Sequence, residues 1–535
     1  MKKIAIVGTG PTGIYTFYSL VQQQTAVAIT LYEQADEAGV GMPYAEDDNS
    51  RLMLANIASI EIPPLFATYL DWLKQQDPLH LARYGVKRAT LHERQFLPRI
   101  LLGEYYRSQF WQLVDHARQR GFQITVRESS EVTDLQVSNE GVKLWANASQ
   151  PEAFDLVVLA TGHVWPDDDE ATRTFFPSPW SGLLEARIPA GKVGIMGVSL
   201  SAIDAAMAVV AQHGEFVETG SDGLAFRLDE QSQALSIALL SRSGILPEAD
   251  FYCPLPYQPL QIVTEQAIER EIAAGEAGLL DRVFALMVKE IELADPRWSE
   301  QISLPSLNAE TFAEAWFADR QQHCPFHWAA KNLAEVERNK RHKHTVAWRY
   351  ALLRLHEPVE DIVPHLSEKD RQRFTITLAR VFIDNYTAIP SESIRRLLAL
   401  RDAGILSIHA LGQDYSMEVG KQSTVIIAED KRFEFATFID ARGQKPQKIR
   451  DLPFPTLRKQ LAVTGEDFPE VAEDYTLLEP PLARGRIAFG ALPYLMHDRP
   501  FVQGLTVCAE IGENIARAVA SLPSRSRRRL PFFGQ

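Results

Sequence analysis

The first 33 residues carry the pattern that most constrains how this chain can fold. An apolar run at residues 3–7 passes directly into the turn Gly8-Thr9-Gly10-Pro11-Thr12-Gly13, and a helical pattern follows it. A second apolar run, residues 27–32, ends in Glu33, at the spacing expected for the acidic residue of a dinucleotide-binding unit. The sequence therefore predicts a parallel sheet with a nucleotide at its first turn.

Each glycine of this turn has a separate role. Gly8 makes the tight turn, Gly10 lets the backbone approach a pyrophosphate, and Gly13 lets the helix pack on the strand. The phosphates would lie at the helix N-terminus, where unpaired N–H groups and the helix dipole attract negative charge. Glu33 is placed to accept a hydrogen bond from an adenosine ribose hydroxyl. A glycine turn in a nucleotide-free sheet is the alternative.

Length and charge bound the remaining possibilities. A chain of 535 residues exceeds what one hydrophobic core usually serves, so two or three domains are expected. Its net charge of −14 gives no reason to expect nucleic acid or an anionic membrane as partner. The sequence contains no run of 18 apolar residues, so no transmembrane helix is predicted. We interpret the basic residues at 525–529 as a solvated tail.

Cysteine and histidine usage points away from redox-active thiols and metals. The three cysteines lie far apart and form no C-x-x-C pair, which excludes a dithiol like that of thioredoxin reductases and fits the cytoplasm. His323, Cys324 and His327 are ligand types, but Pro325 breaks the helix that would align them. No metal is expected.

A second turn of the same kind begins at residue 193. Gly197 is followed by Ser199, where the second glycine of the pattern is expected, and then by Ser201. A serine side chain would hinder close approach of the backbone to a pyrophosphate. The strand pattern at 235–240 precedes Arg242, which suits a ribose 2′-phosphate and therefore NADP over NAD; a surface arginine is the alternative.

The remaining patterns predict an α/β chain with two Rossmann-like dinucleotide-binding units, β-meanders and an inserted, mainly helical domain. Residues 124–126, 132–137 and 142–145 have the alternation of short antiparallel strands. The predicted domains are a first unit at 1–180, a second unit at 181–262, a helical insert at 263–400, and a return meander with a C-terminal part that completes the first unit at 401–535. Helices are predicted at 265–273, 279–291, 311–318, 346–355 and 392–403.

Several loops resemble those of a known family. They are residues 39–44 (GVGMPY), 54–56 (LAN), 96–99 (FLPR) with Gly103 and Tyr105, and 160–163 (ATGH). The chain resembles flavoproteins with two dinucleotide-binding domains, and in particular the YdhS-like bacterial FAD/NAD(P)-binding proteins, which neighbour N-hydroxylating and other flavin-dependent monooxygenases. The resemblance implies FAD on the first unit and allows NADPH on the second.

The same resemblance implies which residues hold the cofactors. The FAD residues would be Gly8, Gly10, Pro11, Thr12, Gly13, Glu33, Gln34, Gly41, Met42, Asn56, Arg99, Thr161, Gly162, Gly490 and Gly504. The NADPH residues would be Gly197, Ser199, Ser201 and Arg242.

These features favour an FAD-dependent oxidoreductase, specifically an NAD(P)H-using monooxygenase that acts on a small polar metabolite. A flavin supplies the redox chemistry, so few acid or base side chains are needed. Arg99 and His163 are candidates for a proton donor near the flavin, although His163 in a capping role is the alternative. Two other functions stay open: a flavin dehydrogenase or oxidase with no working nicotinamide site, and a non-catalytic flavin-binding sensor or scaffold.

Overall fold

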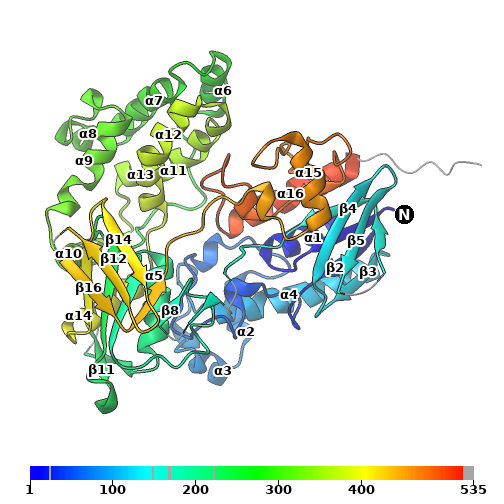
Figure 1. Cartoon of the computed structure of the whole chain (residues 1–535). Helices are drawn as coiled ribbons and strands as arrows, with labels where there is room; N and C mark the ends of the chain where they lie inside the picture. The colour runs from blue at the N-terminus through cyan, green and yellow to red at the C-terminus, as the bar shows by residue number, and fades with distance from the viewer. Residues whose placement is uncertain are drawn as a thin grey trace, which may run out of the picture.

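The computed structural model describes residues 1–521 except 23–25, 148–149, 167–169, 173, 221–222 and 430. The basic residues at 525–529 lie outside the described residues. Figure 1 shows a first α/β unit at the right, a second at the lower left, and a group of helices above them. The predicted class, α/β with two dinucleotide-binding units and a helical region, is confirmed.

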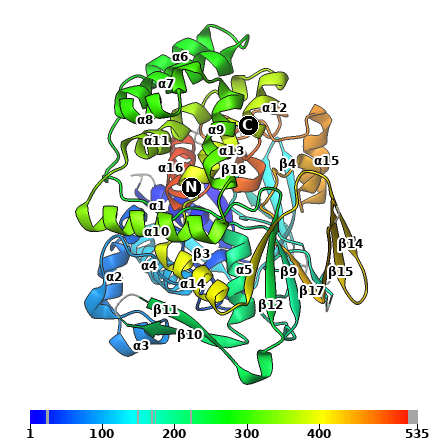
Figure 2. The ribbon, with the colours of Figure 1, turned by 90° about the vertical axis from the view of Figure 1, so that its left-hand side faces the viewer.

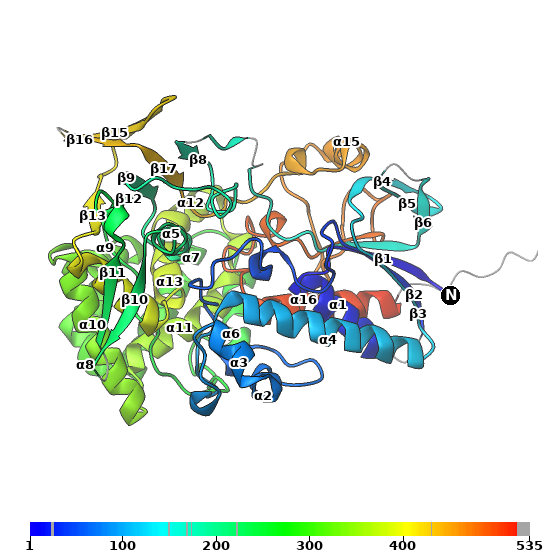
Figure 3. The same cartoon turned by 90° about the horizontal axis from the view of Figure 1, so that it is seen from below.

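The first unit is built on a five-stranded sheet in the order β18-β7-β1-β2-β3, in which every pair is parallel. Its strands are β1 (Lys3–Val7), β2 (Ala28–Tyr32), β3 (Gln123–Arg127), β7 (Leu156–Leu159) and β18 (Ile487–Phe489). The helices α1 (Pro11–Gln22), α4 (Arg99–Gln119) and α16 (Leu505–Ser521) lie side by side against it (Figure 3). Two short helices, α2 (Tyr69–Gln75) and α3 (Pro78–Arg83), precede α4.

One predicted strand pairing in the first unit is wrong. The strand predicted at 124–126 was expected in an antiparallel meander, but β3, which contains it, pairs parallel with β2. The long helix α4 crosses over between them, and a crossover helix returns the chain in the same direction. The antiparallel meander consists of β4 (Val132–Ser138), β5 (Gly141–Ala146) and β6 (Glu152–Phe154), against which α15 (Pro455–Leu461) packs.

The second unit has its own five-stranded sheet, in the order β13-β12-β9-β17-β8. Figure 2 shows β9, β12 and β17 side by side, with the β14–β15 strands at the outer edge. The strands of the sheet are β8 (Phe175–Phe176), β9 (Lys192–Met196), β12 (Ser236–Ser241), β13 (Leu406–Ala410) and β17 (Thr437–Asp440). The unit also contains α5 (Leu200–Val210), α14 (Ser391–Asp402), the hairpin β10 (Gly214–Thr219) and β11 (Gly223–Leu228), and the meander β14 (Tyr415–Val419), β15 (Thr424–Ala428) and β16 (Lys431–Phe435).

This sheet corrects the predicted domain limits. The segment from 401 onwards was expected to complete the first unit, but β13 pairs with β12 and β17 pairs with β9. The two residues of β8 also pair with β17, so the first unit does not extend to residue 180. Likewise α14 belongs to the second unit, because it packs on β11 and β13. The chain returns to the first unit only after β17.

The helices between the two halves of the second unit form the helical domain. They are α6 (Glu265–Ala273), α7 (Leu279–Ala294), α8 (Pro296–Gln301), α9 (Ala309–Gln321), α10 (Pro325–His342), α11 (Ala347–Glu360), α12 (Glu368–Ile376) and α13 (Leu378–Tyr386). In Figure 2, α10 runs between the upper helices and the second unit. Its apolar residues Phe326, Leu333 and Val336 join the core of the second unit, so α10 connects the two bodies.

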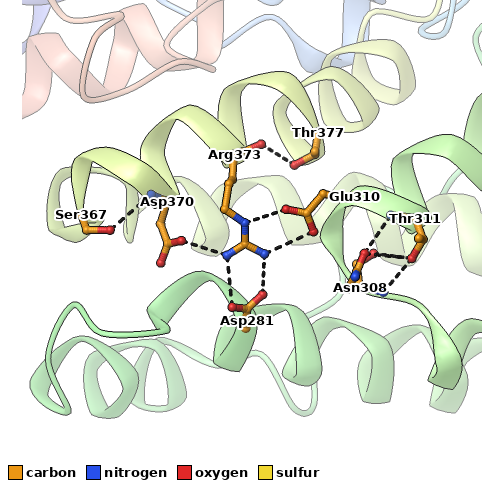
Figure 4. A network of polar contacts seen from close by, with 8 residues as sticks. All are labelled: Asp281, Asn308, Glu310, Thr311, Ser367, Asp370, Arg373 and Thr377. Carbon is orange, nitrogen blue, oxygen red and sulfur yellow. Dashed lines mark hydrogen bonds and ion pairs between the residues drawn. The ribbon is translucent and has the colours of Figure 1, made fainter.

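One arginine ties three helices of this domain together (Figure 4). Arg373 on α12 binds both carboxylate oxygens of Asp281 on α7, at 2.8 and 3.1 Å. It also donates to Glu310 on α9 at 2.6 and 3.2 Å, and to Asp370 one turn earlier on α12 at 2.9 Å. These bonds to Arg373 lower the pKa of both Asp281 and Glu310. The three helices are therefore held as one body.

The helical domain contacts the first unit through the segment that precedes α16. Phe501 is buried among His356, Phe374, Phe382 and Tyr386, all from the helical domain, at ring-centroid distances of 5.6 to 6.1 Å. The backbone N–H of Phe501 donates to Glu360 Oε1 at 2.6 Å. This phenylalanine from the first unit is thus part of the core of the helical domain.

This contact predicts a pH-dependent stability. Burial raises the pKa of Glu360 from its ordinary 4.5 to about 7; the Phe501 N–H and Arg499 oppose this rise, and Asp361 and Glu510 add to it. The folded chain then binds more protons than the unfolded chain between these two pH values. The contribution of Glu360 to the free energy of unfolding is therefore fully present below pH 4.5 and is lost as the pH rises through 7.

We expect Glu360→Gln to remove a pH-dependent change of about 3 kcal/mol in the free energy of unfolding. The measurement is denaturant unfolding at a series of pH values from acid to mildly alkaline. Glu357→Gln, on the same helix but half-exposed and paired with Arg354, should keep the wild-type pH profile. Parallel profiles for Glu360→Gln and wild type would contradict the assignment.

Candidate functional site

The predicted FAD residues gather at one edge of the first sheet. Gly8 follows β1, Glu33 follows β2, residues 160–162 follow β7, and Gly490 follows β18. All of these strands are parallel, so the residues lie at their carboxyl ends. β1 lies between β2 and β7, where the order of strands along the chain reverses. Such a crevice is where open parallel sheets bind nucleotides.

The glycines at this edge are fixed by close backbone contacts. Gly8 has φ +96°, and a Cβ there would lie 2.3 Å from the carbonyl oxygen of Ala160. A Cβ on Gly13 would lie 2.1 Å from the carbonyl oxygen of Gly8, which confirms that helix α1 packs directly on the turn. A Cβ on Gly490 would lie 2.9 Å from the methyl group of Thr12. The strand ends therefore meet closely around the first turn of α1.

The first turn of α1 presents backbone N–H groups of the kind that bind an anion. Pro11 begins the helix, so its missing N–H costs no hydrogen bond, and the next N–H groups have no partner within the helix. Gly41, at φ +84°, lies against this turn, and a Cβ there would be 2.9 Å from Gly10 Cα and 3.1 Å from Pro11 Cδ. This contact brings Met42 beside the turn. Backbone N–H groups at a helix N-terminus suit a pyrophosphate.

Glu33 fits the ribose of a dinucleotide. Its side chain is buried at the end of β2, and Oε2 accepts from the N–H of Thr9 at 3.0 Å and from Thr9 Oγ1 at 2.7 Å. Oε1 accepts from the N–H of Ala35 at 3.1 Å. A carboxylate has about four acceptor positions, so one stays available for a ribose hydroxyl. Gln34, next along the chain, is exposed at the same edge.

The segment before α2 carries a buried acceptor that needs a donor. Among the described residues, Asn56 Oδ1 is buried and accepts no hydrogen bond. A buried amide oxygen without a partner is costly, and a ligand N–H would satisfy it. Gly504, at φ +98°, precedes α16, and Thr161 Cα would lie 3.3 Å from a Cβ on Gly8, with Gly162, at φ +69°, next along the chain. The residues present therefore fit an elongated dinucleotide such as FAD.

Arg99 makes contacts that the sequence did not predict. Its Nη2 forms an ion pair with Asp204 on α5 at 2.6 Å, and its Nε donates to the carbonyl oxygen of Leu54 at 3.1 Å. Both charged side chains are largely buried, at 13% and 8% exposure. Burial raises the pKa of Asp204, and Arg99 opposes the rise. Arg99 thus joins the two units, and we assign it a positioning role.

Sequence reasoning missed Asp204. The available signal was a single carboxylate within the apolar stretch Leu200–Val210, since an isolated acid on a buried helix face needs a partner. Two further contacts join the units: Met53 of the first unit lies in the core of the second, and Arg396 donates to the carbonyl oxygen of Leu52 at 2.6 Å. The loop that carries Asn56 is therefore held from both sides.

His163 lies in the first connection between the two units. Its Nδ1 lies 2.9 Å from Oε1 of Gln444, which belongs to the return connection. An amide oxygen only accepts, so Nδ1 carries the proton. Gln444 Nε2 in turn donates to the carbonyl oxygen of Val164 at 3.2 Å. Burial lowers the pKa of His163, so the ring is neutral at pH 7. The two connections are thus bonded to each other.

The predicted NADPH residues also come together. Gly197 follows β9 at φ +133°, and its N–H donates to the carbonyl oxygen of Leu240 at 2.7 Å, which places the turn beside the end of β12. The exposed Arg242 follows that strand. Ser199 is the N-cap of α5 in extended backbone, so glycine is not required there for the chain to turn, and its side chain is exposed at the helix N-terminus. Ser201 lies in the first turn of α5.

Three comparisons relate the chain to known proteins. The FAD-NAD(P)-binding family model matches residues 5–164, and the YdhS-like middle domain model matches residues 264–386, which is the helical domain. The YdhS protein of Escherichia coli K12 is 66% identical over 533 residues, which cover 99% of this chain and 100% of that protein. The chain therefore contains an FAD/NAD(P)-binding domain.

Two solved structures share the fold along almost the whole chain. They are ornithine hydroxylase (PvdA) from Pseudomonas aeruginosa and ornithine N-hydroxylase KtzI from Kutzneria sp. 744. Each has a TM-score of 0.50 and covers 97% of this chain and 98% of its own, with 14% and 12% sequence identity respectively. At this level of identity the likeness concerns the fold alone.

Neither a membrane-spanning helix nor a metal site is found among the described residues. Within the described ranges, no helix combines the length and the apolar character that crossing a membrane requires. In the same part of the chain, no three histidine, cysteine or acidic side chains come together as metal ligands. Cys324 is exposed at the N-cap of α10, apart from the buried Cys253 and Cys508.

Proposed function

The chain belongs to the YdhS family, and from that premise we propose that it is an FAD-dependent, NADPH-using monooxygenase of a small polar, nitrogen-containing metabolite. The observation that carries the proposal is the cradle at the carboxyl ends of β1, β2, β7 and β18, with its close glycine contacts and the buried carboxylate of Glu33. The fold shared with two ornithine hydroxylases supports this class of reaction.

In such an enzyme the cofactor carries the redox chemistry, so the chain needs no catalytic triad. FAD, when bound, supplies hydride acceptance and oxygen activation. The chain binds and orients the cofactor through the α1 turn and Glu33, and it holds the loop of residues 52–56 between the units through Arg99. Because His163 is neutral and bonded to Gln444, we assign it to the connection between the units and not to proton donation.

We place the substrate where the loop after Asn56 meets the helical domain. Tyr257 Oη lies 3.5 Å from Glu61 Oε1, and the Arg354 guanidinium lies over the Tyr257 ring at 4.6 Å. Burial raises the pKa of Glu61. Three segments thus supply a carboxyl, a phenol and a guanidinium. We propose that these groups orient a polar substrate beside the flavin end of the cradle.

The proposal is tested by stopped-flow absorbance of the FAD-loaded protein. We expect one NADPH per flavin to reduce the FAD and so remove its visible absorbance. Oxygen should then restore that absorbance. Addition of the correct metabolite should then couple oxygen consumption to formation of a hydroxylated product. Flavin that NADPH does not reduce would contradict the nicotinamide part of the proposal.

One observation favours a second candidate, a flavin dehydrogenase or oxidase that takes electrons from its substrate. Ser199 replaces the glycine that permits close approach to the nicotinamide pyrophosphate. Binding to the native state raises the melting temperature by mass action. A melting temperature unchanged by NADPH and NADH would support this second candidate.

Arg242 offers a specific test of the NADPH site. If it contacts the 2′-phosphate, Arg242→Ala should weaken NADPH binding about tenfold or more, since a charge-assisted hydrogen bond contributes about 1.5–3 kcal/mol. NADH binding should be unchanged, because NADH has no 2′-phosphate. Titration of both nucleotides measures the difference, with Arg432→Ala, another exposed arginine of this unit, as control. Equal effects on both nucleotides would argue against a phosphate contact.

A further inference from the structure

We propose that Phe501 is a positioning residue through which the helical domain holds the FAD site in its binding conformation. The inference rests on the proposed function, because it assumes that the turn of α1 and the approach to α16 receive FAD. It assigns the helical domain a role in retaining the cofactor. Neither the strand pairing nor the match to the family models indicates such a role.

Phe501 anchors the segment before α16 in the helical domain. Phe501 is only 4% exposed, although it belongs to a segment of the first unit that contributes no other residue to the core of the helical domain. Its ring lies 5.6 Å from Phe382 and 5.8 Å from Tyr386, both edge-on. Such aromatic contacts have a preferred geometry, so they fix the orientation of the ring as well as burying it.

Polar contacts from the helical domain also hold the chain at Phe501 and just before it. Glu360 accepts the N–H of Phe501 at 2.6 Å. Arg371, on α12, donates to the carbonyl oxygen of His497 at 3.3 Å and pairs with Asp498 at 3.2 Å. The helical domain therefore holds residues 497–501 at several points.

The anchored segment is connected to the FAD cradle through α16. Only three residues separate Phe501 from Leu505, where α16 begins. α16 packs along α1: a Cβ on Gly512 would lie 2.6 Å from the backbone nitrogen of Thr16, and Thr12 Oγ1 donates to Cys508 Sγ at 3.2 Å. Thr12 is in the first turn of α1, next to Gly13. The contacts thus run without a gap from the helical domain to the pyrophosphate turn.

These contacts make the start of α16 depend on the helical domain. Without the ring of Phe501, residues 499–503 lose their apolar anchor in the core of the helical domain and are held by polar contacts, such as that from the Phe501 N–H to Glu360, and by local backbone bonds, such as that from the N–H of Val502 to the carbonyl oxygen of Arg499 at 3.1 Å. A segment with fewer buried apolar contacts opens more readily and samples more conformations. FAD would then bind only the fraction of molecules in which α16 begins correctly, and its apparent affinity would fall by that fraction.

The test compares two cavity variants of one core. Phe501→Ala removes the anchor, whereas Phe284→Ala removes a phenylalanine of equal burial from α7 in the same cluster, with Phe312 as its ring neighbour. FAD is titrated into each apoprotein and binding is followed by flavin fluorescence, and the melting temperature of each apoprotein is recorded separately. Phe501→Leu, which retains an apolar anchor, is the conservative variant and the substitute if Phe501→Ala does not fold.

We expect both alanine variants to melt at lower temperature than wild type. Only Phe501→Ala should lose FAD affinity, by about tenfold, a typical coupling between sites, while Phe501→Leu recovers most of it and Phe284→Ala stays within about twofold of wild type. Wild-type affinity in Phe501→Ala, or an equal loss in Phe284→Ala, would overturn the inference. Wild-type protein that binds no FAD would instead overturn the proposed function.

Discussion

Gly13→Ala is expected to abolish FAD binding. The new Cβ would lie 2.1 Å from the carbonyl oxygen of Gly8, a backbone atom that cannot move without opening the turn between β1 and α1. Overpacking in a core typically costs 1–3 kcal/mol, and a contact this short with backbone should reach about 3 kcal/mol or more. Because each 1.4 kcal/mol is a factor of ten, FAD affinity should fall at least about a hundredfold.

The measurement is FAD binding to the purified variant by equilibrium dialysis, with its circular dichroism as a check on the fold. Gly191→Ala is the matched control: no atom lies within 4 Å of the position of its Cβ among the described residues, so it should bind FAD like wild type. A Gly13→Ala variant that retains bound FAD would show that the cofactor does not depend on this turn.

Arg99→Ala is expected to destabilise the protein by about 3–5 kcal/mol, because it leaves the carboxylate of Asp204 buried without its counter-charge. Asp204 is only 8% exposed on its side chain, and burial already raises its pKa. The change is measured as the free energy of unfolding in urea. Arg227→Ala breaks an ion pair whose side chains are 70% and 60% exposed, and it should change stability by less than about 1 kcal/mol.

A double variant separates the lost pair from the lost packing. Arg99→Met combined with Asp204→Leu replaces both charges with apolar side chains, and such replacements are often neutral or stabilising. We therefore expect the double variant to be more stable than Arg99→Ala. If the double variant is the less stable of the two, the penalty in Arg99→Ala comes from lost contacts of the arginine stem and not from the buried charge.

The sequence predicted the parts of the fold that depend on near neighbours in the chain. The strand, turn and helix at residues 3–22 follow from apolar runs and glycine spacing, which act within a few residues. The helix α6 was predicted with the same limits as observed, Glu265–Ala273, and its start is set locally, since the Thr264 side chain caps the first turn by accepting the N–H of Ala267. Local rules of this kind are visible in any single sequence.

The errors concern partners that are distant in the chain. The run at 123–127 has the alternation of an edge strand, but its pairing with β2 depends on the crossover helix α4. The meander after residue 401 has the same pattern as the first one, and nothing local indicates that β13 and β17 pair with β12 and β9. Which sheet a strand joins is decided by tertiary packing.

The candidate site shows the same division. The glycines and Glu33 were identified because their spacing is fixed by one turn. The partners of Arg99 and Phe501 were not, since Asp204 and the cage of His356, Phe374, Phe382 and Tyr386 lie more than one hundred residues away in the chain. These long-range contacts define how the three bodies hold one another, and only the folded chain reveals them.

The central claim is that the turn at Gly8–Gly13 cradles FAD. The most direct measurement is the visible absorption spectrum of the purified protein after incubation with excess FAD and removal of the free cofactor. We predict a flavin spectrum with one FAD per chain, which is lost in Gly13→Ala. A folded wild-type protein that stays colourless after this treatment would contradict the account.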